Sequence, residues 1–158
     1  MFELKPIDEE TREEAVNLII ENWGSHIIVT KGKIHSARDL PGFIVNVNGK
    51  IGGLITCHIE NGECEIVCLE STFQNQGFGT NLIDKVVETA RGHNCKRVWL
   101  ITTNDNTHAI RFYQKRGFNI AGIHINAIQE SRKIKPQIPL YGFDNIPILH
   151  EIEFEKIL

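Results

Sequence analysis

A glycine-containing turn offers the first chemistry in this sequence, because it joins an apolar strand pattern to the start of an amphipathic helix pattern. Its residues are Gln74, Asn75, Gln76, Gly77, Phe78, Gly79 and Thr80. Glycine lets backbone approach a ligand closely, and the free N–H groups at a helix N-terminus can bind an anion such as a pyrophosphate. The turn is not a Walker loop, and it lacks the third glycine of the dinucleotide fingerprint. Taken alone, it is explained equally well as a turn without a ligand.

A second motif follows about thirty residues later. It runs from Asn106 to Phe118 with the pattern N-x-x-A-x-x-F-Y-x-x-x-G-F, and it predicts a helix over 107–116 that stops at Gly117. Tyr113 lies on this helix, and a phenol, whose pKa is near 10, can act as a general acid. On spacing alone, a core aromatic residue with its hydroxyl at the rim is the simpler interpretation of Tyr113.

Two carboxylates occupy alternate positions of a predicted strand. Glu63 and Glu65 therefore share one face of it, where either can act as a general base. Exposed carboxylates at a sheet edge are the alternative interpretation. His58 and His108 are weaker candidates, because a lone histidine in a strand or helix is more often a packed or surface residue.

The order of the two motifs, Q-x-x-G-x-G and then N-x-x-A-x-x-F-Y-x-x-x-G-F, resembles that of the GNAT superfamily of acyl-CoA-dependent N-acetyltransferases. The expected element order is similar from about residue 2 to residue 154. The resemblance implies an α+β domain with α/β/α layers. Its central sheet would be mixed, mostly antiparallel, of about seven strands, and splayed between the fourth and fifth. Acetyl-CoA would be the cosubstrate, with pantetheine in the cleft, and an amine would attack its thioester directly.

The resemblance also implies roles for individual residues. The Gln74–Thr80 turn would bind the CoA pyrophosphate, with Gln74 standing where the family often has Arg. Tyr113 would be the general acid, and Glu65, which is closer to the splay than Glu63, the preferred base. Other cofactor contacts would come from Leu69, Asn104, Asn106, Ala109, Phe112 and Lys115. Arg111 or Arg116 would share the phosphates with Lys115, unless these three form only a solvated basic face.

Hydrophobic periodicity predicts the elements that carry these residues. Strands are expected at 2–7, 43–47, 51–59, 63–69, 97–102, 118–128 and 149–154, and helices after Asp8, over 77–92 and over 107–116. Asn48-Gly49 and Asn61-Gly62 predict two hairpin turns, so that the strands from 43 to 69 form an antiparallel meander. A short helix is expected near Ile34–Asp39, and the proline-containing segment 129–148 shows little periodicity.

Composition limits the functional classes. The 158 residues, 41% hydrophobic and 23% charged, predict a single domain over 1–158. The net charge of −3 provides no basic field for nucleic acid. No secretory signal or membrane-length apolar run is present, so a cytoplasmic protein without membrane contact is expected. The four cysteines, Cys57, Cys64, Cys68 and Cys95, form no CxxC pair and have no clustered histidines, so no metal is expected.

The acceptor is the partner about which the sequence says least. The resemblance places its site at roughly Trp23–Leu40 and 129–148, whose basic residues would favour an acceptor with a carboxylate or another anion. The polar residues concerned are His26, Lys31, Lys33, His35, Arg38, Arg132, Lys133, Lys135 and Tyr141. A small-molecule amine is the leading acceptor, and a protein N-terminus or lysine is the alternative. A homodimer through 129–148, a non-catalytic acyl-CoA-binding module, and nucleotide binding at Gly77 and Gly79 stay open.

Overall fold

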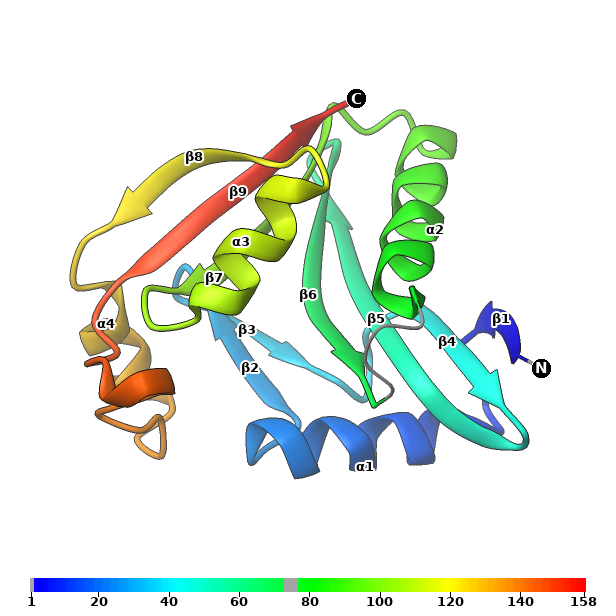
Figure 1. Cartoon of the computed structure of the whole chain (residues 1–158), viewed down its shortest axis with the longest axis horizontal. Coiled ribbons are helices and arrows are strands. Elements are labelled where there is room, and N and C mark those ends of the chain that lie inside the picture. Colours follow the sequence, from blue (N-terminus) through cyan, green and yellow to red (C-terminus); the bar gives the residue numbers. More distant parts are fainter. Residues whose placement is uncertain (1, 73–76) are drawn as a thin grey trace.

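The computed structural model describes residues 2–72 and 77–158, and in this part of the chain the framework is a sheet of seven strands (Figure 1). In spatial order the strands are β1 (Phe2–Pro6), β4 (Gly42–Val47), β5 (Lys50–Glu60), β6 (Glu63–Ser71), β7 (Arg97–Thr103), β9 (Glu151–Ile157) and β8 (Asn119–His124). Neighbours are antiparallel except for β6 and β7, which run parallel. The mixed, mostly antiparallel sheet of an α+β domain is thereby confirmed.

Both faces of the sheet are covered (Figure 1). The covering elements are α1 (Arg12–Trp23), the hairpin of β2 (Ile27–Thr30) and β3 (Lys33–Ser36), α2 (Phe78–Gly92) and α3 (Thr107–Lys115). Apolar side chains of α2 and α3 pack on one face, and those of α1 and the hairpin pack on the other. No helix within residues 2–72 and 77–158 has the length and apolar character that crossing a bilayer requires.

The parallel pair β6 and β7 separates along its length. Register pairs join them only from Glu63 with Arg97 to Ile66 with Leu100. Beyond these pairs β6 continues to Ser71 and β7 to Thr103 without pairing to each other. Because β6 and β7 are the fourth and fifth strands across the sheet, the expected splay is confirmed.

A β-bulge lies where the splay begins. Thr56 of β5 is opposite Cys68, but Cys57 is opposite Ile66, so Val67 is an extra residue in β6. A bulge interrupts the alternation of side chains along a strand. As a result, Leu69 packs in the core under α2 and α3, whereas Glu65 lies on the face covered by the hairpin.

Two local expectations were wrong. The short helix expected near Ile34–Asp39 is strand β3 and a turn, because Lys31 and Gly32 both have positive φ (49° and 74°) and form a two-residue hairpin turn. The strand expected over 118–128 ends at His124, since Asn126 adopts a left-handed φ of 60° and starts α4 (Ala127–Ile134). Segment 129–148 thus contains most of α4 and a 3-10 turn at Phe143–Asn145.

Candidate active site

The N-terminus of α2 lies beside α3 at the glycine turn. Three residues predicted to bind the cofactor, Gln74, Asn75 and Gln76, lie outside the described residues. Gly77 caps α2 with a φ of 75°, and Phe78 is buried. A Cβ atom on Gly79 would lie 3.1 Å from Cζ of Phe112. A side chain at position 79 would therefore push the Phe112 ring away from the helix, which explains the glycine there.

Arg116 of the α3 C-cap extends to this turn. Its Nε donates to Oγ1 of Thr80 at 2.9 Å, and its guanidinium lies 3.5 Å from the ring centre of Phe112. Lys115 and Arg111 are exposed, and neither has an ion pair within the described chain. The first turn of α2 thus has the positive charge of Arg116 beside the positive end of the helix dipole, a combination that can bind phosphate.

Tyr113 lies on the buried side of α3. Its ring is 5.6 Å from that of Phe118 and 6.2 Å from that of Phe154, centre to centre. Burial raises the pKa of Tyr113, and the neighbouring Cys68 and Glu70 of β6 raise it further. The phenol is therefore protonated at neutral pH and able to donate a hydrogen bond.

The two predicted asparagines make different contacts. Oδ1 of Asn106 accepts the N–H of Ala109 at 3.1 Å and caps α3, which leaves its amide nitrogen without a partner among the described residues. Oδ1 of Asn104 accepts the backbone N–H groups of residues 149 and 150, and its amide donates to the carbonyl of Pro147. Asn104 therefore joins the end of β7 to the segment before β9. Of the two asparagines, Asn106 has the side-chain nitrogen that remains available to a ligand.

On the hairpin side of the sheet, two carboxylates lie just before the splay. Glu65 is 3% exposed; its Oε2 accepts the Thr30 hydroxyl at 2.6 Å, and its Oε1 lies 3.2 Å from Nε2 of His35. Glu63 is 34% exposed, and its Oε1 accepts from Nε of Arg97 at 2.7 Å. Both line a pocket of about 240 Å³, with Thr30, Lys31, Lys33, His58, Glu60, Asn61 and Trp99. The structure thus brings both predicted bases to one pocket.

Ion pairs with β9 hold the hairpin over this pocket. Glu153 accepts from Lys31 at 2.9 Å, from Arg97 at 2.7 Å and contacts Nε2 of His124 at 3.1 Å. Burial alone would raise the pKa of Glu153, but the three hydrogen bonds outweigh it and lower the pKa to about 2. Glu151 accepts the backbone N–H of Lys31, yet burial raises its pKa.

Comparison with known proteins identifies the family. The model of the Acetyltransferase (GNAT) family matches residues 4–118, well over half of the chain. The chain belongs to the GNAT acetyltransferase family. Two relatives from Bacillus subtilis (strain 168) carry the names uncharacterized protein YxbD and uncharacterized protein YdhI. YxbD is 42% identical over 139 residues, 87% of each chain, and YdhI is 38% identical over 159 residues, 100% of this chain and 99% of YdhI.

Solved structures share the fold. The IAA acetyltransferase from Bacillus cereus ATCC 14579 has a TM-score of 0.74 at 18% identity and covers 100% of both chains. A GNAT family acetyltransferase from Elizabethkingia anophelis, with acetyl-CoA bound, has a TM-score of 0.73 at 21% identity over 99% of this chain and 98% of that one. The layered fold with a splayed sheet is thus that of GNAT acetyltransferases.

In this GNAT acetyltransferase most of the basic residues expected around the acceptor have partners within the described chain. Lys31 and Lys33 pair with carboxylates, while Arg132 and Lys135 donate to backbone carbonyls. Lys133 pairs with its helix neighbour Glu130. These cations are already neutralised or bound, whereas three carboxylates line the pocket. The pocket therefore offers no free cluster of positive charge to an anionic acceptor.

Sequence reasoning missed several residues of the acetyltransferase's pocket as functional. Thr30 gave no signal, and His35 was expected only among the polar residues near the acceptor, since a short helix was predicted where β3 lies. Trp99 was read only as part of a strand. A signal for Glu153 did exist, since Glu151, Glu153 and Glu155 alternate with apolar residues along the last strand, a pattern that gives that strand one acidic face.

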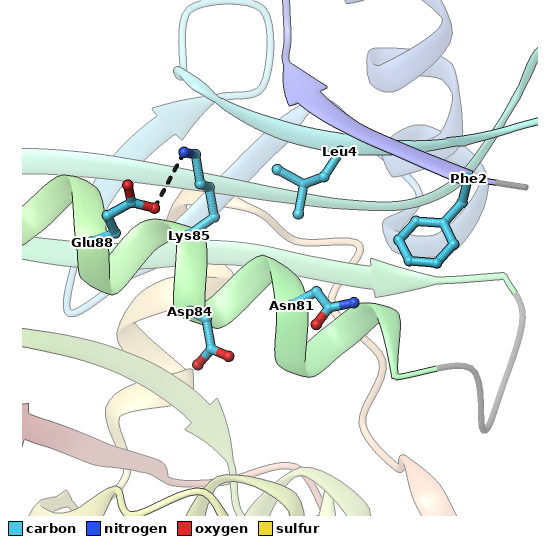
Figure 2. A pocket seen from close by; sticks show the side chains of 6 residues that line it. All are labelled: Phe2, Leu4, Asn81, Asp84, Lys85 and Glu88. Atoms are coloured by element: carbon cyan, nitrogen blue, oxygen red, sulfur yellow. Dashed lines mark hydrogen bonds and ion pairs between the residues drawn. The ribbon is translucent and has the colours of Figure 1, made fainter.

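Another hollow, of about 320 Å³, lies between β1 and α2 (Figure 2). It is lined by Phe2, Leu4, Asn81, Asp84, Lys85 and Glu88. Lys85 and Glu88 pair within it at 3.2 Å. None of the predicted site residues lines this hollow, so the polar pocket beside the splay is the candidate active site of the acetyltransferase.

Among the described residues, no group of three or more His, Cys, Asp or Glu side chains is arranged to hold a metal ion.

Proposed function

We propose that this acetyltransferase transfers the acetyl group of acetyl-CoA to a primary amine of a small molecule, by direct attack in a ternary complex. The position of Glu65 carries the proposal. Its register partner is Trp99, and the next pair, Ile66 with Leu100, is the last before β6 and β7 separate. A buried carboxylate at that point can take a proton from an amine on the hairpin side while the thioester lies in the splay.

The residues around the splay fit acetyl-CoA. The α2 N-terminus and Arg116 suit phosphates, and Gly79 keeps the backbone accessible. Beyond Ile66, β6 is not paired with β7, so Leu69 can offer its backbone to an extended amide chain as a neighbouring strand would. When bound, acetyl-CoA supplies an activated acyl group and a thiol leaving group.

The chain's own residues then act on the attacking amine and on the departing sulfur. Glu65 accepts the proton of the attacking amine, whereas Oε1 of Glu63 is already engaged by Nε of Arg97. The protonated hydroxyl of Tyr113 donates a hydrogen bond to the departing sulfur. Burial raises the pKa of Cys68 to about 12, so this thiol is a poor nucleophile, which favours direct transfer over an acyl-enzyme.

The pocket also supports a class of acceptor. Its volume of about 240 Å³ suits a small molecule. Glu60, Glu63 and Glu65 line it together with Lys31 and Lys33, and both lysines are engaged in ion pairs. An amine that arrives as a cation and carries no carboxylate is therefore the acceptor that this lining favours.

The test begins with thermal unfolding in the presence of acetyl-CoA, CoA, ATP and NAD. At about 100 times the dissociation constant, a ligand stabilises by roughly 2.7 kcal/mol, or about 5–11 °C for a chain of this size. We expect a shift with both CoA species and none with ATP or NAD. The absence of a shift with either CoA species would contradict the proposal.

Turnover is then measured as thiol release with a panel of amines, half of which carry a carboxylate. Glu65→Gln should lower kcat at least about 100-fold. Glu88→Gln, the same change at an exposed site on α2, is the control and should leave kcat unchanged. Faster turnover of the carboxylate-bearing amines would contradict the proposed acceptor class.

A further inference from the structure

Two side chains of the β2–β3 hairpin hold the Glu65 carboxylate. Thr30 donates to one oxygen at 2.6 Å, and Nε2 of His35 lies 3.2 Å from the other. Thr30, His35 and Glu65 are 6%, 4% and 3% exposed, so water does not replace these contacts. The carboxylate therefore has one donor already in place and one imidazole beside its second oxygen.

The imidazole contact is close but not aligned. Nε2 of His35 is buried and has no hydrogen-bond partner among the described residues, although Oε1 of Glu65 is within 3.2 Å. Buried polar atoms without a partner are rare and often mark a functional site. A proton that arrives at Glu65 would give this pair the hydrogen bond it lacks, after a small rotation of the ring.

We propose that His35 is a positioning residue for acetyl transfer: it orients the Glu65 carboxylate and shares the proton that Glu65 takes from the acceptor amine. This inference rests on the proposed function. In the step, one N–H bond of the acceptor's ammonium breaks, and the proton comes to lie between Oε1 of Glu65 and Nε2 of His35. The amine's electron pair is then free to form the new N–C bond to the acetyl carbon.

Charges around the pair explain why His35 in particular has this role. The groups that face the pocket or its edge are Lys31, Lys33, His58, Glu60, Glu63, Arg97, Glu151 and Glu153. Glu60, Glu63 and Glu153 each have a Lys or Arg partner. Within the described chain, Glu65 has no such partner, and His35 is the one ionisable side chain paired with it.

The hairpin is held at both ends, as a positioning role requires. At its tip, Lys31 pairs with Glu153 at 2.9 Å. At its base, Nζ of the mostly buried Lys135 donates to the carbonyl of Ile27 at 2.9 Å, and Nδ1 of His26 is 3.1 Å from the Ser36 hydroxyl. The distance between His35 and Glu65 is thus set by contacts outside the pair.

A double-mutant cycle tests the proposal, with an amine accepted by the wild type. His35→Phe should lower kcat at least about 10-fold while KM for acetyl-CoA stays the same, and His35→Gln, which restores a polar group, should recover most of the loss. In the Glu65→Gln background, His35→Phe should change kcat by less than about 2-fold, because its partner is gone. His26→Phe is the matched control for a loosened hairpin and should not reproduce this coupling.

An unchanged kcat in His35→Phe, or the same loss in the Glu65→Gln background as in the wild type, would overturn the role of His35. If His35→Phe does not fold, His35→Gln and Thr30→Val are carried through the same cycle, and additive effects of both with Glu65→Gln would overturn it. A wild type that binds acetyl-CoA but acetylates no amine would overturn the proposed function and this inference with it.

Discussion

The ion pairs of Glu153 should make the stability of this domain depend on pH in the acid range. The pKa of Glu153 is lowered from 4.5 to about 2 in the folded chain. A carboxyl group whose pKa is lowered by folding stabilises the protein above its unfolded pKa, and this contribution is lost as the pH falls through the folded pKa. The window therefore lies between about pH 4.5 and pH 2. The difference corresponds to about 3 kcal/mol, an upper value that salt screening reduces toward about 2.

The assay is urea unfolding of the wild type and of Glu153→Gln at a series of pH values. At pH 7 we expect the variant to be less stable by about 2–3 kcal/mol, because Lys31 and Arg97 lose a buried partner. The gap should narrow as the pH falls from about 4.5 toward 2. Glu155→Gln is the matched control, since Glu155 also pairs with Arg97 but is 29% exposed, and its effect should be smaller. An equal gap at pH 7 and pH 3 would refute the reasoning. Because Lys31 then releases the hairpin tip, Glu153→Gln should also raise KM for the acceptor and leave acetyl-CoA binding intact.

Three further predictions concern acetyl-CoA. Tyr113→Phe should lower kcat about 10- to 100-fold with an unchanged dissociation constant for CoA, which calorimetry and thiol release together measure; an unchanged kcat would remove Tyr113 from the acid role. Arg116→Ala should weaken CoA binding about 5- to 20-fold, whereas Lys115→Ala, the neighbouring control, should change it less than about 2-fold; the reverse order would show that Lys115 is the phosphate contact. Gly79→Val should weaken acetyl-CoA binding at least about 10-fold, since its Cβ lies against Phe112 and its methyl groups cover the helix N-terminus, and titration calorimetry should detect the loss.

The parts of the fold that depend on residues adjacent in the sequence could be predicted. Asn48-Gly49 and Asn61-Gly62 have positive φ at both positions, as the predicted two-residue turns require, and the meander of β4, β5 and β6 follows from them. The hairpin of β2 and β3 uses the same geometry at Lys31 and Gly32. Lysine is uncommon at positive φ, so its turn carries a much weaker signal than Asn-Gly does.

The candidate site likewise contains some contacts that a local sequence pattern predicts and others that it does not. The alternation of Glu63 and Glu65 on one strand predicted that they share a face, and both line the same pocket. His35 and Glu153 contact two residues of that pocket, Glu65 and Lys31, from far along the chain, and no local pattern specifies such contacts. Asn104 shows the converse, because the family resemblance suggested a cofactor contact for it, while its amide is bonded to the segment before β9.

In the proposed reaction, a single extra residue in β6 allows this strand to face both substrates. Without the bulge at Val67, regular alternation would place Leu69 on the same face as Glu65. With the bulge, Leu69 packs against the core on the face of α2 and α3, while Glu65 lies under the hairpin. The cosubstrate and the amine can then approach from opposite faces and meet where β6 leaves β7. The proposed direct transfer needs such an arrangement, since the amine must reach the acetyl carbon without displacing the thioester that carries it.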